Sequence, residues 1–127
     1  MSRWLEWLAE AQPDMFIELS EELAAENPSA ASCVIARAVS ALPSLVELAS
    51  PLLLNGGRLI ALKGPLTAEE LTAGRAAAGL CGMRFVSEDR YKLPGGENRT
   101  VVVFQREGRS RTPLPRRPGM AQRHPLA

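Results

Sequence analysis

Two basic residues stand where a protein built on a β-sheet would meet a charged ligand. Arg37 follows the apolar run of residues 32–36, and Lys63 ends the apolar run of residues 58–63. In open α/β sheets, ligands bind in the crevice beyond the carboxyl ends of the strands. Both side chains are therefore candidates to contact an anionic group of a ligand. The alternative is that they are ordinary strand-end charges that reach solvent.

The sequence lacks the residues that several other kinds of chemistry require. The sequence contains no glycine-rich GxGxxG or GxxxxGK[ST] loop, and its single histidine, His124, lies three residues from the end. Histidine-based catalytic triads and metal centres are therefore not expected. Cys33 and Cys81 lie in apolar surroundings with no Cys or His at metal-ligand spacing, so we expect two buried, reduced thiols.

The net charge of +1 conceals an uneven distribution of charge along the chain. Residues 1–30 hold seven acidic side chains against Arg3 alone. From residue 106 onward Glu107 is the only acid, and it faces six arginines: Arg106, Arg109, Arg111, Arg116, Arg117 and Arg123. Because clustered arginines suit bidentate phosphate contacts, this end is a candidate site for a phosphate-bearing partner. The alternative is a solvated C-terminus without a partner.

The spacing of apolar residues predicts helices that alternate with strands. Residues 4–11 favour an amphipathic helix closed by Pro13, and residues 15–19 favour a short strand. Ser20 begins a short helix or turn that ends at residues 27–29. Residues 32–36 and 58–63 are typical of strands buried on both faces of a parallel sheet.

The remaining elements follow from capping and turn signals. Pro43 begins a helix that continues to Leu52, with its last turn loosened by Pro51, and Thr67 opens a further helix with a capping box. Residues 83–93 and 99–105 are two strands joined by a loop too short for a crossover helix. These strands must pair antiparallel.

This order of elements predicts an α/β fold in which a parallel sheet carries helices on both faces and ends in an antiparallel hairpin. The length fits one domain, residues 1–106, followed by a basic Pro- and Arg-rich tail, residues 107–127, that lies over the domain or over a partner. No apolar run approaches the roughly 20 residues of a membrane span, and the first residues do not resemble a signal peptide. We therefore expect a cytoplasmic protein.

Three segments, in the same order along the chain, resemble one family. Residues 34–47 are similar to the pattern V-x-x-R-A-[VL]-A-x-L-x-x-L-x-E, residues 51–64 to P-L-L-K-x-G-G-x-x-x-A-x-K-G, and residues 116–126 to R-[RK]-x-G-x-P-x-[KR]-x-P-L. These are motifs of the bacterial 16S rRNA guanine-N7 methyltransferase G family, also called glucose-inhibited division protein B. The chain resembles the C-terminal part of that family, which implies a partial class I methyltransferase (Rossmann-like) sheet.

The resemblance also implies a cofactor, a reaction and a partner. The family transfers a methyl group from S-adenosyl-L-methionine to N7 of a guanine in 16S rRNA, so the partner would be this rRNA or the small ribosomal subunit. Guanine N7 is already nucleophilic, so positioning and charge matter more than a strong base, and no catalytic residue is predicted. By motif, Ser20, Glu21 and Arg37 match cofactor-binding positions. A plain helix cap is the alternative for Ser20 and Glu21.

Four basic residues are candidates to contact the RNA. Lys63 would neutralise a substrate phosphate near the methyl donor, because it lies at the ligand edge of the predicted sheet. The other three candidates lie in the tail: Arg116, Arg117 and Arg123.

One departure from the family bears on activity. Family members place a glycine-rich turn and an acidic residue before the part that matches this chain, and without the turn no backbone N–H groups hold the donor. One hypothesis is a methyltransferase that is complete only with an upstream segment. The other is an inactive remnant that binds RNA or a protein partner through the basic tail. In either case the open sheet edge would be covered by an upstream segment or by a second copy.

Overall fold

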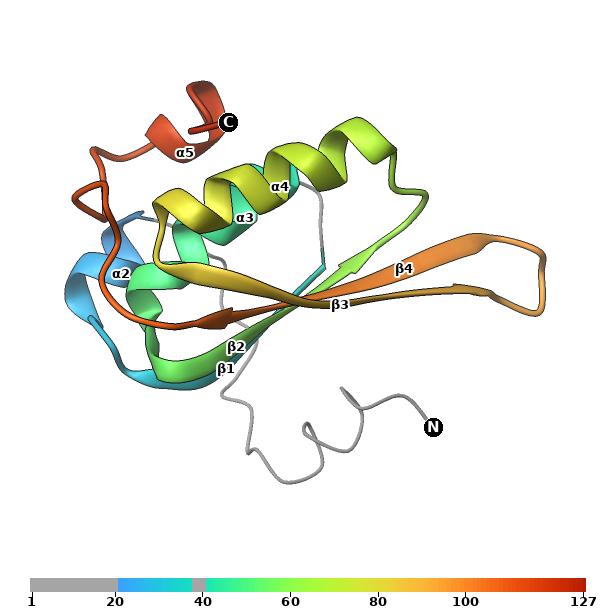
Figure 1. Ribbon diagram of the computed structural model, residues 1–127, viewed down its shortest axis with the longest axis horizontal. Coiled ribbons are helices and arrows are strands. Elements are labelled where there is room, and N and C mark those ends of the chain that lie inside the picture. The colour runs from blue at the N-terminus through green and yellow to red at the C-terminus, as the bar shows by residue number, and fades with distance from the viewer. Residues whose placement is uncertain (1–20, 38–40) are drawn as a thin grey trace.

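The computed structural model describes residues 21–37 and 41–127 (Figure 1). Its elements follow one another along the chain as α2 (Glu21–Glu26), β1 (Ala31–Arg37), α3 (Leu42–Ala49), the 3-10 helix η1 (Ser50–Leu52), β2 (Leu53–Lys63), α4 (Ala68–Leu80), β3 (Met83–Lys92), β4 (Asn98–Arg106) and α5 (Met120–Arg123). The helix and strand predicted before Ser20, and Ser20 itself, lie outside the described residues.

The four described strands form one mixed sheet in the order β1-β2-β4-β3. Strands β1 and β2 pair parallel, whereas β4 pairs antiparallel with both β2 and β3. The predicted α/β fold with a C-terminal antiparallel hairpin is therefore confirmed. Within the described residues, no strand pairs with the outer edge of β1.

The connection between the parallel strands differs in detail from its prediction. Helix α3 ends at Ala49 rather than Leu52, and η1 forms the loosened last turn expected at Pro51, which has no N–H to donate. Strand β2 then begins at Leu53, before the predicted start at residue 58. An irregularity in its pairing with β1 accommodates the extra residues, and Gly56 lies there at φ +85°. Glycine is the residue that adopts this conformation at no steric cost.

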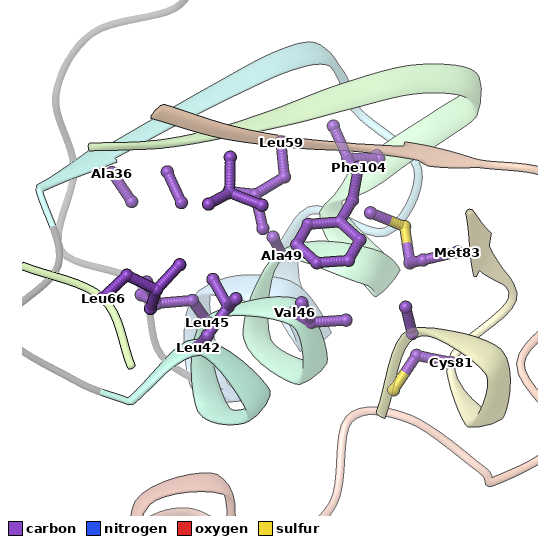
Figure 2. Packing of buried hydrophobic residues seen from close by; sticks show 14 residues of the cluster. Ala36, Leu42, Leu45, Val46, Ala49, Leu59, Leu66, Cys81, Met83 and Phe104 are labelled. Carbon is purple, nitrogen blue, oxygen red and sulfur yellow. The ribbon is translucent and has the colours of Figure 1, made fainter. Parts of the chain in front are cut away.

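The main hydrophobic core lies between the sheet and helices α3 and α4 (Figure 2). Leu59 and Phe104 project from β2 and β4 toward Leu45 and Val46 of α3, and all four side chains are at most 4% exposed. The ring of Phe104 also meets the edge of Phe85, with ring centroids 5.9 Å apart. These contacts bury the apolar stripe of α3 that its sequence spacing predicts.

The opposite face of the sheet has its own apolar cluster. Cys33, Ile60, Val101 and Val103 are at most 3% exposed and pack together on this face. The described helices α3 and α4 contribute to the main core, so within residues 21–37 and 41–127 no helix belongs to this second cluster. Helices on this second face stay a prediction. Both cysteines are buried and neither forms a disulfide with another cysteine of the described residues, as predicted.

Helices α3 and α4 pack closely because α4 has a glycine at their contact. The hydroxyl oxygen of Thr67 accepts the N–H of Glu70 at 3.1 Å and so begins α4, as its capping sequence predicts. One turn later Gly74 lies against Leu42, which is fully buried. A Cβ at Gly74 would lie 2.6 Å from Leu42 Cδ2 and 2.7 Å from its Cγ, so a larger residue cannot fit without movement of α3.

We predict opposite effects for two Gly→Ala substitutions in α4. Gly74→Ala lowers the free energy of unfolding by about 1–2 kcal/mol, because overpacking at Leu42 outweighs the gain in helix propensity. Gly79→Ala is the matched control, since no atom lies within 4 Å of its added Cβ. It raises the free energy of unfolding by about 1 kcal/mol. Urea unfolding of both variants measures the difference, and equal effects would contradict the close packing.

Candidate functional site

The carboxyl ends of β1 and β2 form the edge at which the sequence places its two candidate basic residues. Because β1 and β2 pair parallel, with Arg37 opposite Leu62, Arg37 and Lys63 lie at the same edge. Consecutive residues of a strand point to opposite faces, so these two side chains lie on different faces of the sheet. The exposed Arg37 shares its face with the second cluster, and Lys63, 9% exposed, shares its face with the main core.

Lys63 is engaged by a carboxylate that the sequence did not single out as its partner. Its ammonium group forms an ion pair and hydrogen bond with Oε2 of Glu70. The same oxygen accepts the backbone N–H of Leu42 at 3.0 Å and so satisfies a free donor in the first turn of α3. A phosphate at Lys63 would therefore compete with Glu70. Contact of Lys63 with RNA stays a prediction.

Two helices begin beside this pair. Helix α3 begins at Leu42 and α4 at Ala68, so the amino ends of both helices meet the carboxyl end of β2 around Glu70. The N-terminus of a helix carries partial positive charge, which favours the Glu70 carboxylate there. The capping sequence predicts a contact for the backbone N–H of Glu70. The side chain of Glu70, however, contacts Leu42, which lies 28 residues earlier in the chain. Local spacing gives no signal for that contact.

The C-terminal segment is held against α3 by a buried ion pair. Arg116 donates from Nε and Nη2 to the two carboxylate oxygens of Glu47, at 2.7 and 2.6 Å. Glu47 is only 2% exposed, so its charge depends on this partner. Arg116 also donates to the carbonyl of His124 at 2.6 Å. Its guanidinium is thus engaged within the chain. Contact of Arg116 with RNA stays a prediction.

Glu21 binds the same C-terminal segment. Its carboxylate accepts the backbone N–H of Gly119 at 3.1 Å and of Ala121 at 2.9 Å, next to the start of α5. Ser44 of α3 donates to the carbonyl of Ala121 at 2.7 Å. Burial alone raises the pKa of Glu21, but these N–H groups and the charge of Arg116 outweigh it and hold the pKa below its ordinary value. Cofactor binding by Glu21 stays a prediction.

The other two arginines predicted to contact RNA are exposed. Arg117 has no hydrogen-bond or ion-pair partner for its side chain among residues 21–37 and 41–127, and Arg123 donates to the carbonyl of Pro118 at 3.2 Å. The tail therefore lies over the domain, and it offers two of its three predicted contacts to solvent.

Burial and the nearby carboxylate of Glu47 raise the pKa of the Cys81 thiol to about 12, despite the opposing charge of Arg116. This thiol is therefore a poor nucleophile.

Neither a cluster of metal-ligating side chains nor a helix suited to cross a membrane occurs in the described residues. Across residues 21–37 and 41–127, no group of three or more His, Cys, Asp or Glu side chains is placed to hold a metal ion. None of the helices in that part of the chain has the length and apolar character needed to cross a membrane.

Comparison with known proteins identifies the family. No family model matches the chain. The chain is 47% identical over 103 residues to ribosomal RNA small subunit methyltransferase G of Deinococcus radiodurans. This match covers 80% of this chain and 41% of that protein. The corresponding protein of Deinococcus deserti is 46% identical over 94 residues, which cover 73% of this chain and 38% of that protein. The chain is related to the C-terminal part of the ribosomal RNA small subunit methyltransferase G family.

One further relative agrees with this family, and one solved structure agrees with the fold. The methyltransferase G of Pelotomaculum thermopropionicum is 39% identical over 95 residues, which cover 74% of this chain and 40% of that protein. The chain thus spans about two fifths of the length of these relatives. The antibiotic-resistance methyltransferase Kmr has a similar fold, with a TM-score of 0.50 and 20% identity over 73% of this chain and 59% of Kmr.

We predict that loss of Arg116 destabilises the protein far more than loss of its neighbour. Arg116→Ala leaves the buried Glu47 carboxylate without its partner and lowers the free energy of unfolding by about 3–5 kcal/mol. Arg117→Ala removes the same charge from an exposed position and changes it by less than about 0.5 kcal/mol. Chemical unfolding of both variants measures the difference. Equal effects would show that the Glu47 pair does not hold the segment.

Glu21 predicts a pH dependence of stability. A carboxyl group whose pKa is lowered by folding stabilises the protein above its unfolded pKa, and this contribution is lost as the pH falls through the folded pKa. Glu21→Gln therefore lowers the free energy of unfolding at neutral pH by about 1–3 kcal/mol, and the deficit shrinks below the ordinary value of 4.5. Glu22→Gln, at the exposed neighbour, is the control. Unfolding across acidic pH tests this, and a pH-independent deficit would contradict it.

Proposed function

We propose that this chain is the C-terminal part of an S-adenosyl-L-methionine-dependent methyltransferase that modifies N7 of a guanine in 16S rRNA. The observation that carries the proposal is the 47% identity over 103 residues to a ribosomal RNA small subunit methyltransferase G. The ligand edge of the sheet supports it, because α/β enzymes of this kind bind ligands beyond the carboxyl ends of their strands. The partner would be 16S rRNA or the small ribosomal subunit in the cytoplasm.

The residues of this chain form one side of such a cofactor site and do not fit the whole cofactor. Arg37 offers an exposed cation at the ligand edge of β1. Nucleotide-bearing cofactors on such sheets are also held by the backbone N–H groups of a glycine-rich turn, and no such turn occurs in the sequence. We therefore propose that another segment completes the donor site along the outer edge of β1. An upstream segment or a second copy of the chain would serve.

The chemistry that this chain would contribute is positioning. Guanine N7 has a free lone pair and needs no general base, so the acceptor must be held in line with the donor and its charge balanced. An exposed cation at the ligand edge, such as Arg37, can neutralise an anionic group of either ligand. No residue is assigned a proton-transfer step.

The second candidate is an inactive remnant that binds RNA or a protein through its basic tail. The absence of a glycine-rich turn in the sequence favours it. The docking of Arg116 onto Glu47 weakens it, because the tail then presents fewer free guanidinium groups than its composition suggests. The two candidates differ in whether the ligand edge binds the methyl donor when the rest of the sheet is supplied.

A chimera tests the proposed function. We would replace the aligned C-terminal part of the Deinococcus radiodurans relative with this chain and assay transfer of radiolabelled methyl groups to unmethylated 16S rRNA, with mass spectrometry for 7-methylguanosine. We expect methylation by the chimera. In the chimera, Arg37→Ala weakens donor binding roughly ten- to a hundredfold, as loss of a hydrogen bond to a charged group does.

Calorimetry with the isolated chain supplies the control. We expect no binding of S-adenosyl-L-methionine, because the donor site is incomplete. Donor binding by the isolated chain would contradict the incomplete site and the inactive remnant alike. A folded chimera that binds the donor but does not methylate 16S rRNA would refute the proposed function.

A further inference from the structure

The β3–β4 hairpin extends the sheet beyond the ligand edge. Lys63, the last residue of β2, pairs with Thr100 of β4. The next pairs of the hairpin, Tyr91 with Arg99 and Lys92 with Asn98, therefore continue past the end of β2. Figure 1 shows the hairpin projecting away from the body of the protein. A polynucleotide bound at the ligand edge would meet this projection.

Cations and an aromatic ring gather at the hairpin. An open hollow of about 320 Å³ lies there, and its lining includes three basic residues, Arg90, Lys92 and Arg99, with no acidic residue. Tyr91 also lines the hollow and is 45% exposed. Side chains alternate along a strand, so Arg90 and Lys92 lie on one face of the hairpin and Tyr91 on the other. Arg99 pairs directly with Tyr91 across the two strands, so their side chains share one face of the hairpin.

The basic side chains at the hollow are available to a ligand. Arg90 pairs with Glu88 at 2.8 Å and Arg99 pairs with Glu97 at 2.9 Å, and the arginine side chains are 58% and 38% exposed. Such exposed pairs contribute little, so either arginine can exchange its carboxylate for a phosphate. The exposed Lys92 has no ion-pair partner among residues 21–37 and 41–127.

We propose that the β3–β4 hairpin is a binding site for single-stranded RNA, with phosphates on Arg90, Lys92 and Arg99 and one base stacked on Tyr91. This inference rests on the proposed function and names the surface that guides the substrate to the ligand edge. Cations interleaved with an exposed aromatic ring are the combination that binds single strands, because unstacked bases can lie on the ring while phosphates meet the cations. A duplex keeps its bases stacked and offers none to Tyr91.

The experiment measures binding of the full 127-residue chain to a fluorescein-labelled oligouridylate by anisotropy over a range of salt concentrations. We expect Tyr91→Ala to weaken binding about tenfold, the scale of one lost base–aromatic stack, and Tyr91→Phe to restore it. Arg90→Ala and Lys92→Ala each reduce the slope of log affinity against log salt by about 0.7, the value for one phosphate contact on a single strand. Tyr91→Ala leaves that slope unchanged.

Arg111→Ala is the matched control. It removes one exposed arginine near Leu80, at the end of α4 and far from the hairpin turn, and we expect wild-type affinity. Near-wild-type affinity for Tyr91→Ala, Arg90→Ala and Lys92→Ala, with a loss for the Arg117→Ala, Arg123→Ala double variant, would place the site in the tail and leave the proposed function intact. Equal affinity for a duplex of the same length would also overturn the hairpin as a single-strand site. A wild-type chain that binds no RNA would overturn it too, while the chimera assay still decides the methyltransferase function.

Discussion

The parallel pairing of β1 with β2 is the constraint on which the rest of the structure depends. Two parallel neighbours cannot be joined by a tight turn, so the chain must cross over one face of the sheet, and it does so through α3. The crossover buries Leu45 and Val46 against Leu59 and Phe104 and so forms the main core. Parallel pairing also brings the carboxyl ends of both strands to one edge. The candidate site and the core therefore have a single origin.

The buried carboxylate of Glu47 on α3 determines where the C-terminal segment packs. Glu47 lies on α3 at 2% exposure, and a buried carboxylate without a partner is costly. Arg116 supplies the partner through two hydrogen bonds, and Glu21 fixes α5 through the backbone of Gly119 and Ala121. Ordering the C-terminal segment costs conformational entropy, which these contacts and the burial of Ala121 offset. The segment that composition marks as a tail is thus packed against α3 and Glu21 by these contacts.

The sequence predicts the elements of this fold better than it predicts their contacts. Strands β1 and β2, the cap of α4 and the β3–β4 hairpin follow from local apolar spacing and turn residues, because those signals act over a few residues. The contacts of Glu70 with Leu42, of Glu47 with Arg116 and of Glu21 with Ala121 join residues 28, 69 and 100 positions apart. No local pattern encodes such partners. Position at the ligand edge could be predicted for Arg37 and Lys63, but the ion pair of Lys63 with Glu70 could not.

The same difference between composition and contacts separates the basic tail from the hairpin as a candidate RNA surface. A count of charges selects the tail, where six arginines face one acid from residue 106 onward. What a phosphate meets, however, is a side chain that is exposed, weakly paired and near the ligand. Arg116 fails the first two conditions because it is bonded to a buried carboxylate. Arg90 and Lys92 are neutralised in a count by Glu88 and Asp89, yet both line an open hollow beside the end of β2. The proposed RNA surface therefore rests on the exposure and pairing of each cation rather than on net charge.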